Sequence, residues 1–332
     1  MSNNYVLAWH DSEKNTGGSK AKQDTVYFLT QDGVKAIDTP YNNWGKVYAS
    51  LTAKYRLSSL NGNLLIQYPS GKPLLRRLWL NAAKHNKSLK TFLLIHDLEV
   101  LRFHNDADHE KKRKEEIRFL DQADGLIALN DKMKSLLTQE GVQAPIVSLK
   151  IWDYHNVQDF NTDYSYRSSI CYAGNLTKSE FLTKLKIENQ LHVFGPNCDK
   201  KLPVNVIYEG EYTPTELPAH LDYNFGLIWD GVSVDTCAGN YGQYLRYNAP
   251  HKASLYLSSG LPIIVWEQAA IADFVVNNGV GKTISRLGDL DNLLASISQD
   301  EFAIMKKNAI NVGKKIRQGY YIKDAFQHLT QI

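Results

Sequence analysis

A lysine stands at the predicted start of a helix within the stretch 225–266. Residues 225–229 (FGLIW) are typical of a buried strand, and Asp230 follows where that strand ends. Pro250 suits the first turn of the next helix, because the N–H that it lacks has no partner there. Lys252 then lies at the helix N-terminus, where free N–H groups and the positive end of the helix dipole attract anions. These residues indicate a site for a phosphate-bearing ligand, although a solvated lysine on an ordinary α/β helix gives the same pattern. The same turn contains His251, Ala253 and Ser254.

Three further groups of polar residues each follow a predicted strand. Parallel α/β sheets bind ligands in the crevice beyond the carboxyl ends of their strands. We therefore expect all three groups to face a ligand site. The groups are Gly17, Gly18 and Ser19 in the loop 11–20, His96 and Asp97 after the strand 91–95, and Gly174, Asn175 and Lys178 after the strand 169–172.

Strands and helices alternate along two stretches of the chain, 5–149 and 169–297. Buried apolar runs separated by amphipathic segments predict two parallel, doubly wound sheets, and hence an α/β fold. The final segment, 301–331, is predicted to be helical with a break near Gly319. We expect an N-terminal Rossmann-like domain over 1–154, a polar linker over 155–168, a C-terminal Rossmann-like domain over 169–312, and a C-terminal helix over 313–332 that packs back on the first domain.

Two such halves joined by a polar link match the GT-B plan of nucleotide-sugar glycosyltransferases, in which the cleft between the halves is the expected active site. This plan implies that the domain 1–154 binds the acceptor and that the domain 169–312 binds the nucleotide sugar. Sugar transfer needs a general base for the acceptor hydroxyl, and positive charge or N–H dipoles for the departing diphosphate. Asp97 suits the base, with His96 as the alternative, although Asp97 could equally cap the turn after its strand. Lys178 and Lys252 suit the leaving group.

Three other residues each have two interpretations. Tyr212 or Tyr247 could cover the nucleotide base or contact a phosphate, and each could instead be an aromatic at the domain surface. Asp230 could orient a sugar hydroxyl or fix the loop that follows it.

No metal site or other cofactor is expected. Two Asp-x-Asp pairs are present, at 106–108 and 289–291, but neither follows a predicted strand, so we interpret both as surface or capping residues. Lysines and helix dipoles can take the place of a divalent ion in the GT-B arrangement, which predicts activity without metal.

Composition limits the class of protein. The chain has 332 residues, 43% of them hydrophobic, and a net charge of +3, which suits two globular domains and gives no argument for nucleic acid. No apolar run is long enough to cross a membrane, the N-terminus lacks a signal-peptide pattern, and three widely spaced cysteines favour the cytoplasm. The segment 72–90 pairs basic residues with leucines. It could lie on the anionic surface at the inner face of the membrane, or it could pack its leucines into a domain core.

The stretch FGLIWDGVSVDTCAGNYGQYLRYNAPHKASLYLSSGLPIIVW resembles the bacterial β-1,6-galactofuranosyltransferases of O-antigen and capsular polysaccharide assembly. The resemblance continues through IHDLEVLR (95–102), KIWDY (150–154) and YAGNL (172–176), and it spans nearly the whole chain. A more distant similarity is to the streptococcal glucosyltransferase that extends GlcNAc on serine-rich adhesins.

This resemblance implies a cytoplasmic, inverting GT-B enzyme that takes UDP-galactofuranose as donor and a sugar hydroxyl of a lipid-linked saccharide as acceptor, with a β-1,6 linkage. The nucleotide contacts of the glucosyltransferase family fall on Lys178, Tyr212 and Lys252. Relatives often have arginine at the first position, and lysine cannot make the same forked contact with a phosphate. A homo-oligomer is also expected.

Three alternatives remain from the sequence. The first is the same fold with UDP-glucose or UDP-galactopyranose as donor, since a few side chains determine the sugar pocket. The second is a non-catalytic GT-B partner subunit, which the set Lys178, Tyr212 and Lys252 argues against. The third is a sugar-nucleotide epimerase on the same two-domain plan.

Overall fold

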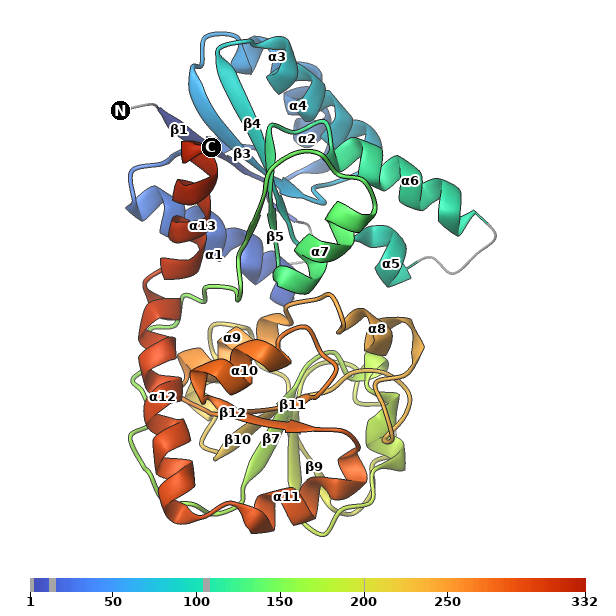
Figure 1. Cartoon of the computed structure of the whole chain (residues 1–332), viewed down its shortest axis with the longest axis vertical. Coiled ribbons are helices and arrows are strands. Elements are labelled where there is room, and N and C mark those ends of the chain that lie inside the picture. Colours follow the sequence, from blue (N-terminus) through green and yellow to red (C-terminus); the bar gives the residue numbers. More distant parts are fainter. Residues whose placement is uncertain (1–2, 12–15, 104–107, 200) are drawn as a thin grey trace. The chain divides into compact units, whose positions relative to one another are not determined.

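The computed structural model describes residues 3–11, 16–103, 108–199 and 201–332. The chain divides into two compact units (Figure 1). The N-terminal unit comprises Met1–Leu149 together with Gly319–Ile332, and the C-terminal unit comprises Lys150–Gln318. Each unit contains one sheet of six parallel strands, so the chain has the predicted α/β class with two Rossmann-like units.

The sheet of the N-terminal unit has the strand order β2-β1-β3-β4-β5-β6. Because β2 and β3 lie on opposite sides of β1, the chain reverses direction in the sheet after β2. The central strands are buried along almost their whole length, which fits a parallel sheet covered on both faces. The strands are β1 (Asn4–Ala8), β2 (Lys35–Asp38), β3 (Gly62–Tyr68), β4 (Leu89–Ile95), β5 (Gly125–Ala128) and β6 (Ile146–Ser148).

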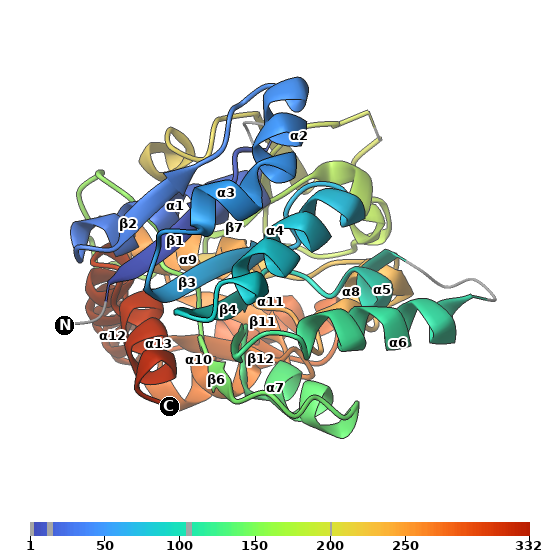
Figure 2. The same ribbon diagram turned by 90° about the horizontal axis from the view of Figure 1, so that it is seen from above.

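The helices that connect the parallel strands of this unit lie on two faces of the sheet. Helices α1 and α13 pack against each other, and α13 also packs on β5 and β6. Helices α2 and α3 pack on α4 across the other face (Figure 2). The helices are α1 (Gly17–Gln31), α2 (Asn43–Leu51), α3 (Ala53–Leu57), α4 (Pro73–His85), α5 (Glu99–Phe103), α6 (His109–Leu120), α7 (Asp131–Gln139) and α13 (Tyr320–Gln331).

The sheet of the C-terminal unit has the order β12-β11-β10-β7-β8-β9, and it also reverses direction once, between β7 and β10. Its strands are β7 (Ile170–Ala173), β8 (Leu191–Phe194), β9 (Val206–Gly210), β10 (Phe225–Ile228), β11 (Ile263–Trp266) and β12 (Gly281–Ile284). Its helices are α8 (Gly239–Tyr244), α9 (His251–Ser258), α10 (Ala272–Asn278), α11 (Leu290–Ser296) and α12 (Gln299–Arg317), with short 3-10 turns η1 (Leu176–Lys178), η2 (Glu180–Lys184), η3 (Leu217–His220) and η4 (Leu287–Asp289).

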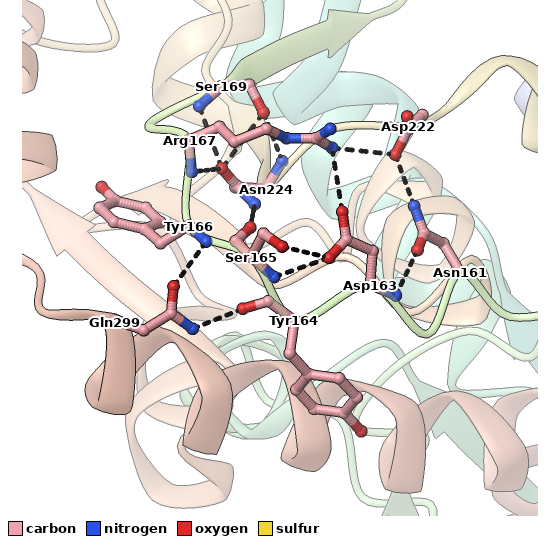
Figure 3. A network of polar contacts seen from close by, with 10 residues as sticks. All are labelled: Asn161, Asp163, Tyr164, Ser165, Tyr166, Arg167, Ser169, Asp222, Asn224 and Gln299. Carbon is pink, nitrogen blue, oxygen red and sulfur yellow. Dashed lines mark hydrogen bonds and ion pairs between the residues drawn. The ribbon is translucent and has the colours of Figure 1, made fainter.

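The segment 155–168 is an ordered part of the C-terminal unit, whereas the sequence predicts a linker there (Figure 3). The Asn224 side chain accepts hydrogen bonds from the backbone N–H groups of Arg167 and Ser169. Gln299, the first residue of α12, accepts from the N–H of Tyr166 and donates to the carbonyl of Tyr164. Side-chain amides thus provide hydrogen-bond partners for the backbone of a segment that has no hydrophobic period. The boundary between the two units falls after Leu149.

The chain returns to the N-terminal unit at Gly319, which adopts a left-handed conformation with φ of 70° between α12 and α13. A side chain at this position would meet the Phe28 ring, since an added Cβ would lie 2.5 Å from it. The break near Gly319 agrees with the sequence prediction, but only 319–332, rather than 313–332, belongs to the N-terminal unit.

Three local predictions differ from the structure. Gly17 and Gly18 are the first residues of α1 rather than a loop, because the Thr16 hydroxyl caps the helix by accepting from the Ser19 N–H. The sequence predicts one helix over 44–56, but the structure divides it at Thr52, whose hydroxyl donates to the Tyr48 carbonyl. The loop after β10 contains a short helix, α8.

Candidate functional site

A candidate site lies at the carboxyl ends of β7 and β10 in the C-terminal unit. These strands are neighbours, but the chain leaves β7 towards β8 and leaves β10 towards β11 on the other side. The connecting segments therefore diverge, and such a switch point is where open α/β sheets form a ligand crevice. Gly174 follows β7 and Asp230 follows β10, so two of the predicted positions meet here.

The Lys252 ammonium group lies at the centre of this site. Its Nζ donates to Asp230 Oδ1 at 2.9 Å, to the Tyr172 hydroxyl at 3.2 Å and to the Trp229 carbonyl at 3.3 Å. Its side chain is 13% exposed and lies 4.4 Å from the centre of the Tyr172 ring. Three acceptors thus hold a nearly buried cation at the switch point. A diphosphate could engage it by replacing one of these acceptors.

Tyr172 carries the polar network from Lys252 to the loop after β7. Its hydroxyl donates to Asp230 Oδ1 at 3.1 Å and lies 2.5 Å from the Ser179 hydroxyl. Burial, reinforced by the Asp230 carboxylate, raises the pKa of Tyr172 well above its usual value. The residue therefore stays a neutral phenol that fixes the positions of Lys252 and Asp230.

Glycines allow the loops after β7 and β8 to approach each other closely. Gly195 has φ of +138°, and an added Cβ would lie 1.9 Å from the Gly174 carbonyl oxygen. The Gly174 N–H donates to the Phe194 carbonyl at 3.0 Å. An added Cβ on Gly174 would lie 3.7 Å from Lys252 Nζ, so the backbone after β7 passes directly beside the cation.

Asn175 and Lys178 shape the turn that follows Gly174. The Asn175 side chain accepts from the Thr177 N–H and from the Asn197 amide, both at 3.1 Å. The Lys178 ammonium lies 4.7 Å from the centre of the Tyr241 ring, and its carbonyl accepts from the Gly231 N–H. The structure therefore places a second cation on the loop next to Asp230, with an aromatic ring as its neighbour.

Tyr212 follows β9 and stacks on His220, with ring centroids 3.7 Å apart and planes inclined by 23°. The next residue, Thr213, forms a reciprocal cap with Glu216, in which the Thr213 N–H and hydroxyl both donate to the Glu216 carboxylate. One face of Tyr212 is thus occupied by His220. Tyr247, before α9, is half-buried, and its N–H donates to the Tyr244 carbonyl.

The start of α9 offers less to an anion than the sequence suggests. The Ala253 N–H already donates to the Pro250 carbonyl at 2.9 Å, and the side chain is buried. Ser254 is fully buried and its hydroxyl donates to the Trp152 carbonyl at 2.7 Å. These two residues anchor the helix, whereas Lys252 reaches the strand ends.

The structure separates the two candidates for a general base in the N-terminal unit. His96 is buried, and its Nε2 lies 2.9 Å from the Gln67 amide oxygen. Asp97 is more accessible, with 21% of its side chain exposed, and forms an ion pair with Arg102. Both residues follow β4 as predicted, and the accessible carboxylate makes Asp97 the better candidate.

A buried carboxylate, Glu116, positions the short helix that follows Asp97. It accepts from the Tyr68 hydroxyl at 2.8 Å and from the N–H groups of Glu99 and Val100 at the start of α5. Burial raises the pKa of Glu116 above its usual 4.5. The mixed charges of the run HEKKRKEE (109–116) predict a solvated helix face. The burial of Glu116 at the end of this run corrects that prediction.

The predicted acceptor-side glycines lie in the first turn of α1. Gly17 and Gly18 are exposed, whereas Ser19 is buried and its hydroxyl lies 2.9 Å from the Thr16 hydroxyl. The helix follows β1, so this turn also lies at the carboxyl edge of its sheet. Residues 12–15 of the predicted loop lie outside the described residues.

The acidic pair 289–291 has structural contacts, and Asp108 is exposed at the start of α6. Asp291 accepts from the N–H groups of Glu188 and Asn189, and Asp289 pairs with Arg286. Asp106 lies outside the described residues. Within the described ranges, no three His, Cys, Asp or Glu side chains are grouped so that they could hold a metal ion. Activity without metal stays a prediction.

Several residues of the site were not found from the sequence. Tyr172 looks like an ordinary core aromatic in an apolar strand, and only its place two residues before Gly174 links it to the site. Ser179 gives no sequence signal, because its partner Tyr172 lies inside the apolar strand β7. Glu116 gives none, because its partner Tyr68 lies 48 positions earlier in the chain.

None of the helices in the described parts of the chain has the length and apolar character needed to span a bilayer.

Both halves of the chain match known domains. Residues 3–151 match the glucosyltransferase 3-like N-terminal domain, and residues 170–329 match the glucosyltransferase 3-like C-terminal domain. Together the two matches cover nearly the whole chain.

Curated relatives are glycosyltransferases. The chain is 29% identical over 339 aligned residues to the β-1,6-galactofuranosyltransferase WbbI of Escherichia coli K12, with 98% of each protein covered. It is 23% identical to glucosyltransferase 3 of Streptococcus gordonii, over 70% of this chain and 69% of the relative.

Solved structures of low sequence identity share the fold. A sucrose-phosphate synthase from Thermosynechococcus elongatus superposes with a TM-score of 0.67 at 11% identity, covering 100% of this chain and 99% of that one. WaaG, a glycosyltransferase involved in lipopolysaccharide biosynthesis, gives 0.56 at 12% identity, covering 98% of this chain and 99% of that one. The two six-stranded parallel sheets and these neighbours place the chain in the GT-B fold class.

Proposed function

Because the chain belongs to the glucosyltransferase 3-like family of glycosyltransferases, we propose that it transfers galactofuranose from UDP-galactofuranose to a sugar hydroxyl of a cell-surface polysaccharide precursor. The proposed linkage is β-1,6. The reaction would invert the anomeric centre, because one general base and no covalent intermediate suffice for the chemistry.

The observation that carries the proposal is the Lys252 ammonium group held at the switch point of the C-terminal sheet. In a direct displacement the leaving diphosphate gains negative charge, and a fixed cation in a nearly buried position stabilises that charge without reorganisation. Lys178 on the adjoining loop would add a second cation, and the outer face of Tyr212 would stack on the uracil ring.

The acceptor would bind to the N-terminal unit. Asp97 would take the proton of the attacking hydroxyl, and the Arg102 ion pair would orient its carboxylate. Glu116 would hold the start of α5 and thereby the position of Arg102. The first turn of α1 would supply further contacts to the acceptor sugar.

The galactofuranose donor is supported by the galactofuranosyltransferase that is similar along the full length. The main alternative is a UDP-pyranose donor, which the match to glucosyltransferase 3-like domains favours. Both donors would use the same cationic site, since they differ only in the sugar ring.

A donor panel tests the proposal. The purified protein would be incubated with UDP-galactofuranose, UDP-galactose, UDP-glucose or UDP-GlcNAc and a simple glucoside acceptor, in the presence of a chelator, and UDP release would be measured. The proposal expects release from UDP-galactofuranose alone. Release only from a pyranose donor would overturn the assigned sugar, and a requirement for added magnesium or manganese would overturn metal independence.

A further inference from the structure

One segment of the N-terminal unit has an unusual balance of charge. Residues 39–96 contain nine Lys and Arg side chains and no Asp or Glu. The rest of the chain contains 29 cationic and 35 acidic side chains, so this segment accounts for the whole positive excess. It forms α2, α3, β3, α4 and β4.

Helices α2 and α3 expose a row of large apolar side chains. Trp44 is 85% exposed, Tyr48 70%, Leu51 67% and Tyr55 84%. The first three residues are spaced i, i+4 and i+7, which places them on one face of α2, and Tyr55 follows on α3. Soluble proteins usually expose large apolar residues singly, so a row of four, three of them aromatic, marks a contact surface.

Helix α4 presents a cationic face beside this aromatic row. Its core-facing side buries Trp79 and Leu80, which agrees with the core interpretation of the leucine-rich segment. Its exposed residues include Leu74, Arg77 and Lys84, which lie on one side of the helix at spacings of three and seven. Helix α4 packs on both α2 and α3 (Figure 2). The exposed residues of the three helices therefore lie on adjoining parts of the same unit.

This surface begins at the edge of the sheet that carries the acceptor-side candidates. Helix α2 follows β2, and α4 follows β3, so both helices start at the carboxyl edge of the parallel sheet. Trp44 and Leu74 lie in their first turns. Asp97 lies at the same edge, after β4. A surface that binds along these helices would therefore extend to the carboxyl edge of the sheet, where the proposed base Asp97 is located.

We propose that the exposed faces of α2, α3 and α4 dock the N-terminal unit on an anionic lipid surface. Tryptophan and tyrosine favour the membrane–water interface, and clustered lysine and arginine favour anionic headgroups. A second copy of the chain fits less well, because a two-fold contact would oppose the exposed cations of two such faces, and the acidic side chain beside the aromatic row, Asp38, leaves each face with a net positive charge. This docking proposal is based on the exposed surface alone and is independent of the proposed donor. Membrane docking would suit an acceptor that is carried on a lipid.

Vesicle co-sedimentation of the full chain tests the proposal. The protein is expected to bind vesicles of phosphatidylcholine and phosphatidylglycerol in low salt, to bind phosphatidylcholine alone more weakly, and to be released by high salt. The triple variant Trp44→Ala, Tyr48→Ala, Tyr55→Ala should weaken binding to anionic vesicles about tenfold or more. The charge-reversed variant Lys54→Glu, Arg77→Glu should remove the preference for the anionic lipid.

The matched control removes three exposed apolar side chains from the C-terminal unit, by Val204→Ala, Val276→Ala and Ile304→Ala. This control should bind vesicles like the wild type. Unchanged binding of the aromatic triple variant, or no vesicle binding by the wild type, would overturn the proposal. So would a wild-type dimer in solution that the aromatic triple variant dissociates. UDP release with a water-soluble acceptor should be equal in all these proteins, so failure of the proposed transferase reaction would be seen separately.

Discussion

Replacing Lys252 by methionine removes the cation at the switch point but keeps a side chain of similar length. In the wild type, Lys252 Nζ donates to Asp230, Tyr172 and the Trp229 carbonyl. If the ammonium also binds the donor diphosphate, Lys252→Met should weaken UDP binding. A hydrogen bond to a charged group contributes about 1.5–3 kcal/mol, which corresponds to a roughly 10- to 150-fold higher Kd.

The same substitution also has a cost in stability. Asp230 would lose its charged partner while 21% of its side chain stays exposed and the Tyr172 hydroxyl still donates to it. Because water and Tyr172 compensate in part, we expect a loss of about 1–2 kcal/mol, below the cost of breaking a fully buried pair. For a unit of this size the melting temperature would fall by roughly 2–8 °C.

Asp230→Asn separates ligand binding from folding. This change also breaks the ion pair, but it leaves the ammonium group in place and removes a negative charge next to the proposed phosphate position. UDP affinity should therefore be unchanged or higher, although stability falls. Lys252→Arg keeps the charge and should lose less affinity than Lys252→Met. Isothermal titration calorimetry with UDP and thermal denaturation would measure both effects on the intact protein.

Two results would refute this reasoning. A Kd for UDP within about twofold of wild type in Lys252→Met would show that the ammonium does not contact the nucleotide. An equal loss of affinity in Asp230→Asn and Lys252→Met would show that both substitutions act only through the local fold.

Three further predictions concern other parts of the chain. Asp97→Asn should lower kcat by about 10²- to 10⁴-fold, as for loss of a general base, while the Kd for UDP stays the same; retained turnover in a single-turnover assay would reject the assignment. Lys306→Met should stabilise the protein at pH 7 by up to about 3 kcal/mol, because burial lowers the pKa of Lys306 to about 8. Between pH 8 and 10.5 the unfolded chain still binds a proton that the folded chain has released, so the free energy of unfolding of the wild type should rise with pH. The stability advantage of Lys306→Met should disappear over the same range. A stability difference between the two proteins that does not change with pH in denaturant titrations would contradict this. Gly195→Ala should destabilise the C-terminal unit by more than about 2 kcal/mol and weaken UDP binding, because the added Cβ would meet the Gly174 carbonyl; a melting temperature equal to that of wild type would show that the loop adapts without cost.

Much of the fold could be predicted from the sequence because local pattern and global topology agree. The segment 63–67, with three apolar residues at its centre, lies within β3, and the apolar run 225–229 covers β10. Strand ends and helix starts are local signals, and parallel strands bring their carboxyl ends to one edge. For that reason Asp230 and Lys252 were predicted to belong to one site, and they form an ion pair there.

The remaining features depend on contacts between distant residues. Tyr172 is indistinguishable from a core residue until Lys252 is placed beside it, 80 positions further along the chain. Glu116 lies in a charged run that predicts a solvated helix, and its burial follows from Tyr68 and from the backbone of α5. The segment 155–168 has no hydrophobic period, and its order follows from contacts with residues far along the chain, such as the side-chain amides of Asn224 and Gln299.

The most direct test of the proposed reaction is proton NMR of the product formed by the wild-type protein from UDP-galactofuranose and a glucoside acceptor. The account predicts a new disaccharide with one β-linked galactofuranosyl residue, because the α-linked donor is inverted at a single centre. An α-linked galactofuranoside would contradict inversion. If UDP-galactofuranose gives no disaccharide and UDP-glucose or UDP-galactose in a parallel reaction does, the assigned sugar is contradicted, while the cationic site at Lys252 remains the proposed donor site.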